Sequence, residues 1–65
     1  MTNSDKLKKW LNDRHYKLSW LENKLMVSKW SVSMWTNGHG IPKRTHRDAI
    51  EEITGGAVPA DGWAR

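Results

Sequence analysis

The amino-acid sequence predicts a compact all-α domain of four or five helices. Apolar residues recur at the three- and four-residue spacing of an amphipathic helix in four short segments, and no convincing strand run is present. Turn-forming residues separate or end these segments, notably Gly38, Gly55 and Gly56. With 65 residues and no cysteine, the chain has room for one domain with a thin core, to which its five tryptophans should contribute.

The first predicted helix starts at Asn3 or Ser4, since either side chain can cap it, and Asp5 in the first turn complements the helix dipole. It should end near residues 14–15, after which Tyr16 folds back toward the core. Its buried stripe, recognised from the helical spacing, consists of Leu7, Trp10 and Leu11.

The second predicted helix covers about residues 18–25. Leu21 and Leu25 are four residues apart and should share its inward face. Its end at Met26 lacks the glycine that a tight turn usually favours, and Val27 should be a buried turn residue.

The third predicted helix covers about residues 29–37. Ser28 can cap it by accepting a hydrogen bond from a backbone N–H of the first turn, and Gly38 can end it. On a helical wheel Val32 and Trp35 share one face, which we expect to be buried. The other face carries Trp30, Ser33, Met34 and Asn37, with Lys29 at its edge.

The last third of the sequence predicts a fourth helix over about residues 43–54. Ile41 should return to the core before it, and Pro42 should restart helical structure at a position that needs no N–H. Its apolar face consists of Ala49, Ile50 and Ile53, with His46 beside it. We expect Val58 and Trp63, in the tail of about residues 55–65, to fold back onto the core.

Residues 17–38 thus have the pattern of a helix-turn-helix, in which two short amphipathic helices are joined by a tight turn. In this motif the outward face of the second helix can enter the major groove of DNA. On this interpretation residues 1–65 form a single helix-turn-helix DNA-binding domain.

The charge distribution suits a polyanionic partner. The chain has a net charge of +4, but the distribution is uneven: residues 1–47 carry a net +7 and residues 48–65 a net −3. A basic body with an acidic end is typical of a protein that binds nucleic acid. Charge alone leaves open the alternative that the lysines and arginines only keep a small domain soluble. No apolar run approaches the length of a membrane span, and the polar start has no signal-peptide pattern.

The sequence resembles the phage Cro and repressor proteins of the Xre-like helix-turn-helix class over about residues 5–63. The resemblance rests on residues 41–42 and 49–58 and on Leu21, Leu25, Val27, Ser28, Val32, Trp35 and Gly38. It implies a lambda-repressor-like fold, two-fold dimers on palindromic operators, and transcriptional repression in the cytoplasm of a bacterial host. Glu22 and Met26 depart from it, because the family usually has a small residue and a glycine there. A left-handed Met26 would be strained by on the order of 1 kcal/mol.

The helix-turn-helix interpretation assigns two sets of DNA-contacting residues. The expected base contacts, on the outward face of the third helix, are Lys29, Trp30, Ser33, Met34 and Asn37. The expected contacts to the sugar-phosphate backbone are Lys17, Ser28, His39, Lys43, Arg44 and Thr45. We expect the partner to be a double-stranded operator bound by a weak homodimer or by a dimer formed on the DNA, with no cofactor.

The sequence also bears on two other classes of function. Catalysis is disfavoured because the three histidines are widely spaced, no cysteine is present and no carboxylate pair is confined to a cleft. A protein-interaction module, such as an antitoxin or antirepressor, remains the alternative, since three residues could form an exposed apolar patch: Trp20, Trp30 and Met34. The lysines expected around this patch favour DNA, because the centres of protein interfaces are depleted in lysine.

Overall fold

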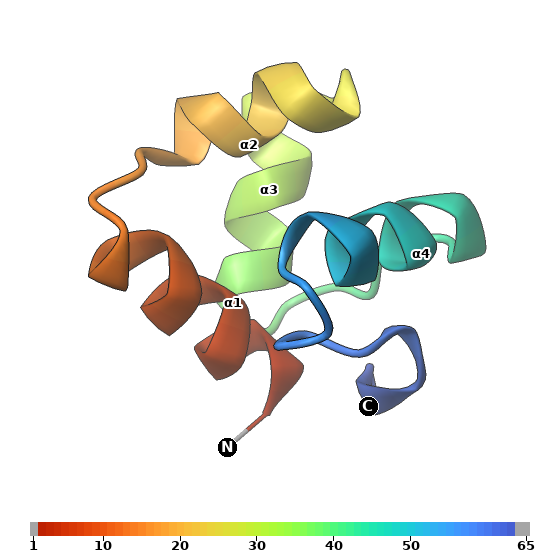
Figure 1. The fold of residues 1–65 in the computed structure, drawn as a ribbon. Coiled ribbons are helices and arrows are strands. Elements are labelled where there is room, and N and C mark those ends of the chain that lie inside the picture. Colours follow the sequence, from red (N-terminus) through yellow and green to blue (C-terminus); the bar gives the residue numbers. More distant parts are fainter. Residues whose placement is uncertain (1, 64–65) are drawn as a thin grey trace.

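The computed structural model describes residues 2–63, in which four α-helices and one short 3-10 helix are present and no strand occurs (Figure 1). The elements are α1 (Asn3–Asp13), α2 (Leu18–Leu25), α3 (Lys29–Thr36), α4 (Arg44–Ile53) and η1 (Ala60–Gly62). The all-α prediction is therefore confirmed. The ends of α2 match the predicted bounds, and those of α1, α3 and α4 differ from them by only one or two residues.

The predicted N-cap of α1 was wrong. Thr2 caps the helix, and its Oγ1 accepts a hydrogen bond from the Asp5 N–H at 3.2 Å. Asn3 is instead buried, and its Nδ2 donates to the Pro59 carbonyl oxygen at 2.6 Å. Ser4 lies within the helix. The side chain of Asn3 thus ties the start of α1 to the C-terminal segment, which leaves the capping role to the residue before it.

The start of α4 also differs from the prediction. Pro42 is buried in the irregular segment before the helix and does not open it. Lys43 follows as the N-cap with an extended backbone (ψ 164°), so helical geometry begins only at Arg44. Ile41 is half-buried and packs against the core, as predicted.

The core is built around five fully buried aliphatic side chains, one from each α-helix and one from the C-terminal segment. They are Leu7, Leu21, Val32, Ile50 and Val58. Around them pack Trp10, Leu11, Leu25, Trp35 and Trp63, each with at most 9% of its surface exposed. The predicted return of Val58 and Trp63 to the core is confirmed. The radius of gyration is 10.2 Å, close to the value of about 11 Å expected for a compact chain of this length.

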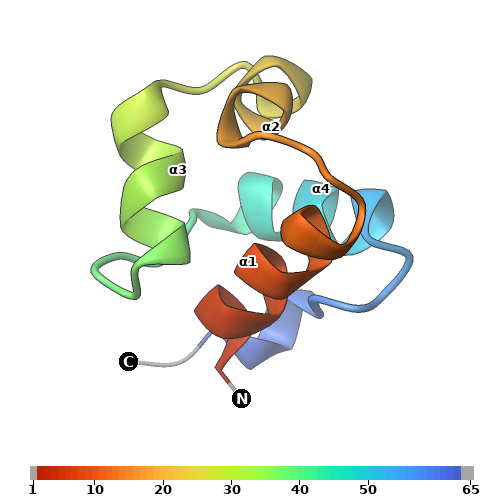
Figure 2. The same cartoon turned by 90° about the vertical axis from the view of Figure 1, so that its left-hand side faces the viewer.

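The helices form one layered cluster in which α3 packs against α2 and α1, and α4 packs against η1. α2 runs crosswise to α3 in both ribbon views, and the segment that leads into η1 returns beside the start of α1 (Figures 1 and 2). Thr54 holds the beginning of that return. Its Oγ1 donates to the Ile50 carbonyl at 2.8 Å and accepts from the Val58 N–H at 3.2 Å.

An aromatic cluster of Trp10, Tyr16 and Trp20 covers the connection between α1 and α2. Tyr16 is 40% exposed, which is more than predicted, but its ring stacks on that of Trp20 at a centroid distance of 4.2 Å. Trp20, which the sequence allowed as part of an exposed apolar patch, is half-buried and packs against the core. The Arg14 guanidinium lies 4.3 Å from the Trp10 ring centroid, in cation–π contact with it.

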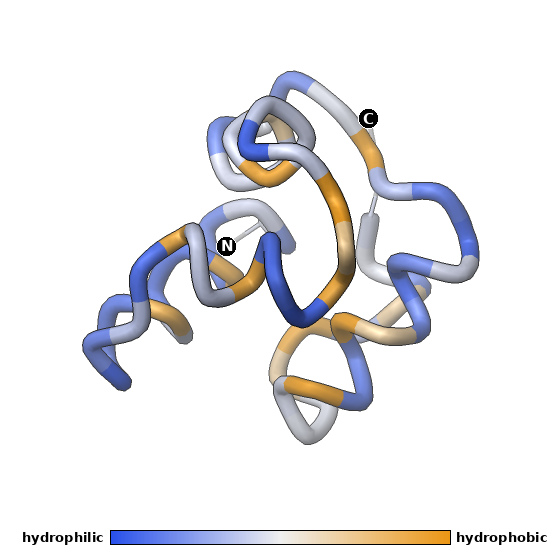
Figure 3. Tube along the Cα trace, turned by 90° about the horizontal axis from the view of Figure 1, so that it is seen from above, coloured by the Kyte–Doolittle hydropathy of each residue, from blue (hydrophilic) through white to orange (hydrophobic). Residues whose placement is uncertain are grey.

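Apolar positions occur only in short stretches along the chain (Figure 3). Within residues 2–63, none of the helices combines the length and apolar character needed to cross a bilayer.

The Thr54 contacts lead to a stability prediction. Thr54→Val keeps the shape of the side chain but leaves the buried Val58 N–H without its acceptor, and should lower the free energy of unfolding by about 1–3 kcal/mol. Thr45→Val, at an exposed position of the same helix, should change it by less than about 0.5 kcal/mol. Urea denaturation followed by tryptophan fluorescence measures both. Equal effects of the two substitutions would contradict the role given to Thr54.

Candidate nucleic-acid interface

A tight connection of three residues fixes how α3 follows α2. Met26 adopts the left-handed conformation (φ 56°, ψ 45°), as predicted for this turn, and is 89% exposed. Its N–H and the N–H of Val27 both bond to the Glu22 carbonyl, the latter at 3.1 Å. Ser28 then caps α3, because its Oγ accepts from the Ser31 N–H at 3.3 Å. The turn between the two helices is thus stabilised by backbone hydrogen bonds at the end of α2 and by a serine cap at the start of α3.

The inner face of α3 is buried and its outer face is not. Val32 is fully buried, and Trp35 and Thr36 are 7% and 5% exposed. The Thr36 hydroxyl, for which the sequence pattern predicted no role, donates to the Val32 carbonyl at 3.0 Å. On the opposite side Trp30 is 71% exposed. The predicted burial of the Val32 side of this helix is therefore confirmed.

The five predicted base-contacting residues lie on the outer side of α3, but to different extents. Lys29, Trp30 and Asn37 are exposed, whereas Ser33 and Met34 are half-buried. Asn37 Nδ2 donates to Ser33 Oγ at 3.3 Å, so these two side chains form one polar unit at the end of the helix. Met34 packs against the core and lies under the loop that follows α3. Its Cε is 3.0 Å from the place that a Cβ on Gly40 would occupy.

Lys17 and Asn37 are brought together although they are twenty positions apart. Both line a groove of about 500 Å³ between the start of α2 and the end of α3. Lys8 and Asn12 of α1 line the same groove, although neither was among the predicted interface residues. Their four-residue spacing shows that they share a helix face, but only the packing of α1 against α3 places that face here.

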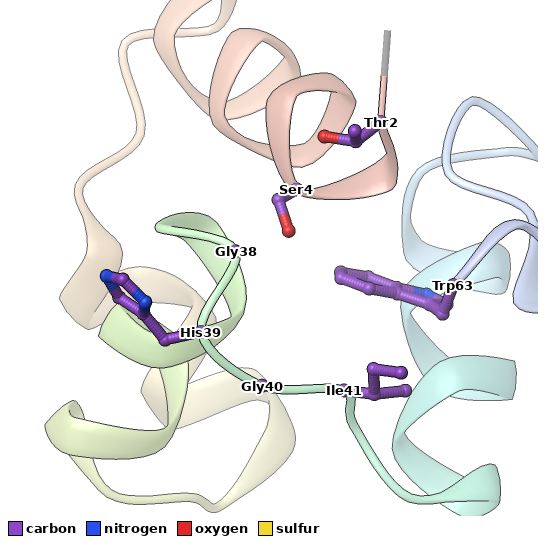
Figure 4. Close-up of a pocket in the computed structure, with 7 residues that line it drawn as sticks. All are labelled: Thr2, Ser4, Gly38, His39, Gly40, Ile41 and Trp63. Carbon is purple, nitrogen blue, oxygen red and sulfur yellow. The ribbon is translucent and has the colours of Figure 1, made fainter. Parts of the chain in front are cut away.

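The segment after α3 adds further exposed polar residues. Figure 4 shows the His39 imidazole projecting away from a cleft of about 460 Å³, toward which Ser4 and Trp63 point. Lys43, Arg44 and Thr45 are exposed at the start of α4, where no side chain caps the backbone N–H groups. Arg44 Nε lies 3.6 Å from a carboxylate oxygen of Asp48, with both side chains largely exposed. Such a surface pair holds the arginine only weakly.

The residues of the candidate interface are all cationic or uncharged. In the predicted set, four residues carry a full positive charge: Lys17, Lys29, Lys43 and Arg44.

Ser28 is exposed, and its Oγ lies 3.1 Å from the Oγ of Ser31 while it caps α3. No group of three or more metal-ligating side chains occurs in the part of the chain described here.

Comparison of the chain with protein-family models, curated proteins and solved structures gives no match. Only the geometry and chemistry of the chain itself therefore bear on its function.

The Met26 turn predicts a stabilising substitution. Met26→Gly removes a side chain that makes little packing contact and relieves the left-handed strain, so it should raise the free energy of unfolding by about 0.5–1 kcal/mol. Asn23→Gly, at an exposed site within α2, should lower it by roughly 0.3 kcal/mol. Both are measured by urea denaturation, and a loss of stability in Met26→Gly would show that the turn is not strained.

The two faces of α3 predict opposite outcomes for two tryptophans. Trp30→Ala should change the free energy of unfolding by less than about 0.5 kcal/mol, since the ring is mostly in solvent. Trp35→Ala should lower it by about 3–5 kcal/mol, because it leaves a cavity in the core. Thermal denaturation followed by circular dichroism compares them directly. A large loss in Trp30→Ala would mean that its ring is packed in the folded chain.

Proposed function

We propose that the chain is a sequence-specific double-stranded DNA-binding repressor of the phage Cro type, with α2 and α3 acting as a helix-turn-helix. One observation carries the proposal: the exposed side of α3 presents Lys29, Trp30 and Asn37 to solvent while Val32 and Trp35 hold the other side in the core. A short helix fixed in this way, with a basic and uncharged outer face, suits the major groove.

The outer face of α3 supplies the base contacts. The major groove is about 12 Å wide and admits a helix of about 10–12 Å diameter. Lys29 can donate to guanine acceptors, and Asn37 can both donate and accept at adenine. Ser33 is short, so it lets the helix lie close to the base edges. Trp30 and the exposed part of Met34 supply apolar contact.

The surrounding residues supply contacts to the sugar-phosphate backbone. Lys17, with Lys8 and Asn12 in the same groove, would hold the strand beside the start of α2. The phosphates beyond α3 would be held by His39, Lys43, Arg44 and Thr45. The uncapped N–H groups at the start of α4 would assist them. Ser28 can donate its hydroxyl hydrogen to a phosphate while its oxygen still caps α3. Contacts of this kind carry the affinity and make it strongly dependent on salt.

We propose further that two protomers assemble on a palindromic operator and exclude the polymerase from it. Their α3 helices would lie in successive major grooves about 34 Å apart. The large exposed apolar residues in the described chain all lie between Tyr16 and Trp30, and none is on α4 or η1. A standard interface covers about 800 Å² per partner, almost a fifth of the 4439 Å² surface of this chain. A dimer that forms mainly on DNA fits these dimensions.

A protein-interaction module on the same fold is the second candidate. The observation in its favour is that four large apolar residues are exposed, Tyr16, Leu18, Met26 and Trp30. Of the apolar patch predicted from the sequence only Trp30 is exposed, because Trp20 and Met34 are half-buried against the core. Exposed apolar groups are common at protein interfaces. Lys17 and Lys29, which adjoin these residues in the sequence, favour DNA, and a binding-site selection separates the two functions.

Selection of binding sites from random duplex DNA tests the proposed function. We expect enrichment of a half-site repeated about one helical turn apart. On the selected duplex, Lys29→Ala and Ser33→Ala should each weaken binding by about 1–3 kcal/mol, with smaller losses on random DNA. Lys9→Ala, on the exposed side of α1, is the matched control and should bind normally. If no sequence is enriched, sequence-specific DNA binding is rejected and the protein-interaction function is favoured.

The salt dependence of binding tests the backbone contacts. Each phosphate contact adds about 0.9 to the slope of log affinity against log salt concentration. Lys17→Ala and Lys43→Ala should therefore each reduce the magnitude of this slope by about 1, whereas Lys9→Ala should leave it unchanged. Fluorescence anisotropy over a series of salt concentrations gives the slopes. An unchanged slope in both variants would place these lysines off the DNA.

A further inference from the structure

Trp30 is the one tryptophan of this chain whose ring lies mostly in solvent. It is 71% exposed, whereas Trp10, Trp35 and Trp63 are at most 9% exposed and Trp20 is half-buried. Its backbone is held firmly in the first turn of α3 by the Ser28 cap, through the bond from the Ser31 N–H. A large apolar ring is thus presented from a rigid part of the proposed DNA surface.

The chemistry of the ring limits what it can read. An indole has one N–H donor and no acceptor, so its hydrogen bonding distinguishes base pairs poorly. Its main property is a flat apolar surface. In the major groove the distinctive apolar group is the methyl at C5 of thymine, which the other standard bases lack.

The neighbours of Trp30 agree with this assignment. The polar side chains Lys29 and Asn37 stand at opposite ends of the helix face, about 12 Å apart along the axis. Trp30 follows Lys29 in the first turn, and the short Ser33 and the half-buried Met34 come one turn later. The face between the two polar ends therefore offers apolar contact, and of its two apolar side chains Trp30 is the more exposed.

We propose that Trp30 reads the C5 methyl group of a pyrimidine, so that each operator half-site contains a thymine opposite the first turn of α3. 5-Methylcytosine carries its methyl at the same place and would satisfy the same contact. This inference rests on the proposed function and names the chemical class of the half-site.

The test removes single methyl groups from the DNA. The probe is the tightest duplex from a random 20-bp selection, in which thymines are replaced one at a time by deoxyuridine and then, at the responsive position, by cytosine or 5-methylcytosine. Dissociation constants are measured by fluorescence anisotropy at fixed salt. At one thymine per half-site, loss of the methyl should weaken wild-type binding about fourfold. Methylation of the substituted cytosine should strengthen binding by a similar factor.

Two variants assign the effect to the ring. In Trp30→Ala the thymine and deoxyuridine duplexes should bind equally. Met26→Ala is the matched control, because Met26 is also a large exposed apolar residue (89%) but lies in the turn before α3. It should keep the fourfold difference. Thermal unfolding of each variant confirms that the fold is intact.

The outcomes separate this inference from the function on which it rests. Wild-type protein that still selects a sequence but binds thymine and deoxyuridine equally would overturn methyl reading and leave DNA binding in place. Methyl discrimination that persists in Trp30→Ala, or disappears in Met26→Ala, would also overturn it. A selection without enrichment would reject both.

Discussion

The burial of Val32 determines which side of α3 is exposed to solvent. Val32 is fully buried with an aliphatic side chain from each other α-helix and from the C-terminal segment. Because α3 has only eight residues, fixing Val32, Trp35 and Thr36 inward leaves it little freedom to rotate. The outward position of Trp30 follows from that constraint. A domain of this size has few large apolar side chains for its core, so a tryptophan left exposed points to a binding role.

Two devices keep α3 in place. At its start, the left-handed Met26 and the Ser28 cap turn the chain within three residues. Near the two ends of the chain, Asn3 makes a part-buried hydrogen bond and Thr54 a buried one, and these bring the last segment back against α1 and α4. The first device sets the direction of α3, and the second closes the core on which α3 rests. Both depend on single polar side chains, so each can be tested by a point substitution.

Much of the fold could be predicted because the information was local. Helical spacing was enough to place Val32 and Trp35 in the core and to give the bounds of α2. Contacts between distant residues were not accessible in this way. Asn3 does not cap α1 but bonds to Pro59, 56 positions away, and Thr2 is the cap. Lys8 joins the groove of Lys17 only because α1 packs against α3. The candidate interface could therefore be predicted along α3 and was incomplete where other helices contribute to it.

The most direct measurement is a backbone amide chemical-shift titration of the full chain with a duplex obtained by binding-site selection. We expect the perturbed amides to cluster in residues 28–39 and at residues 8, 12, 17 and 43–45, with little change around Lys9 on the outward side of α1 or in η1. Perturbations confined to the aromatic cluster of Trp10, Tyr16 and Trp20, with α3 unaffected, would contradict the claim that the exposed side of α3 faces DNA.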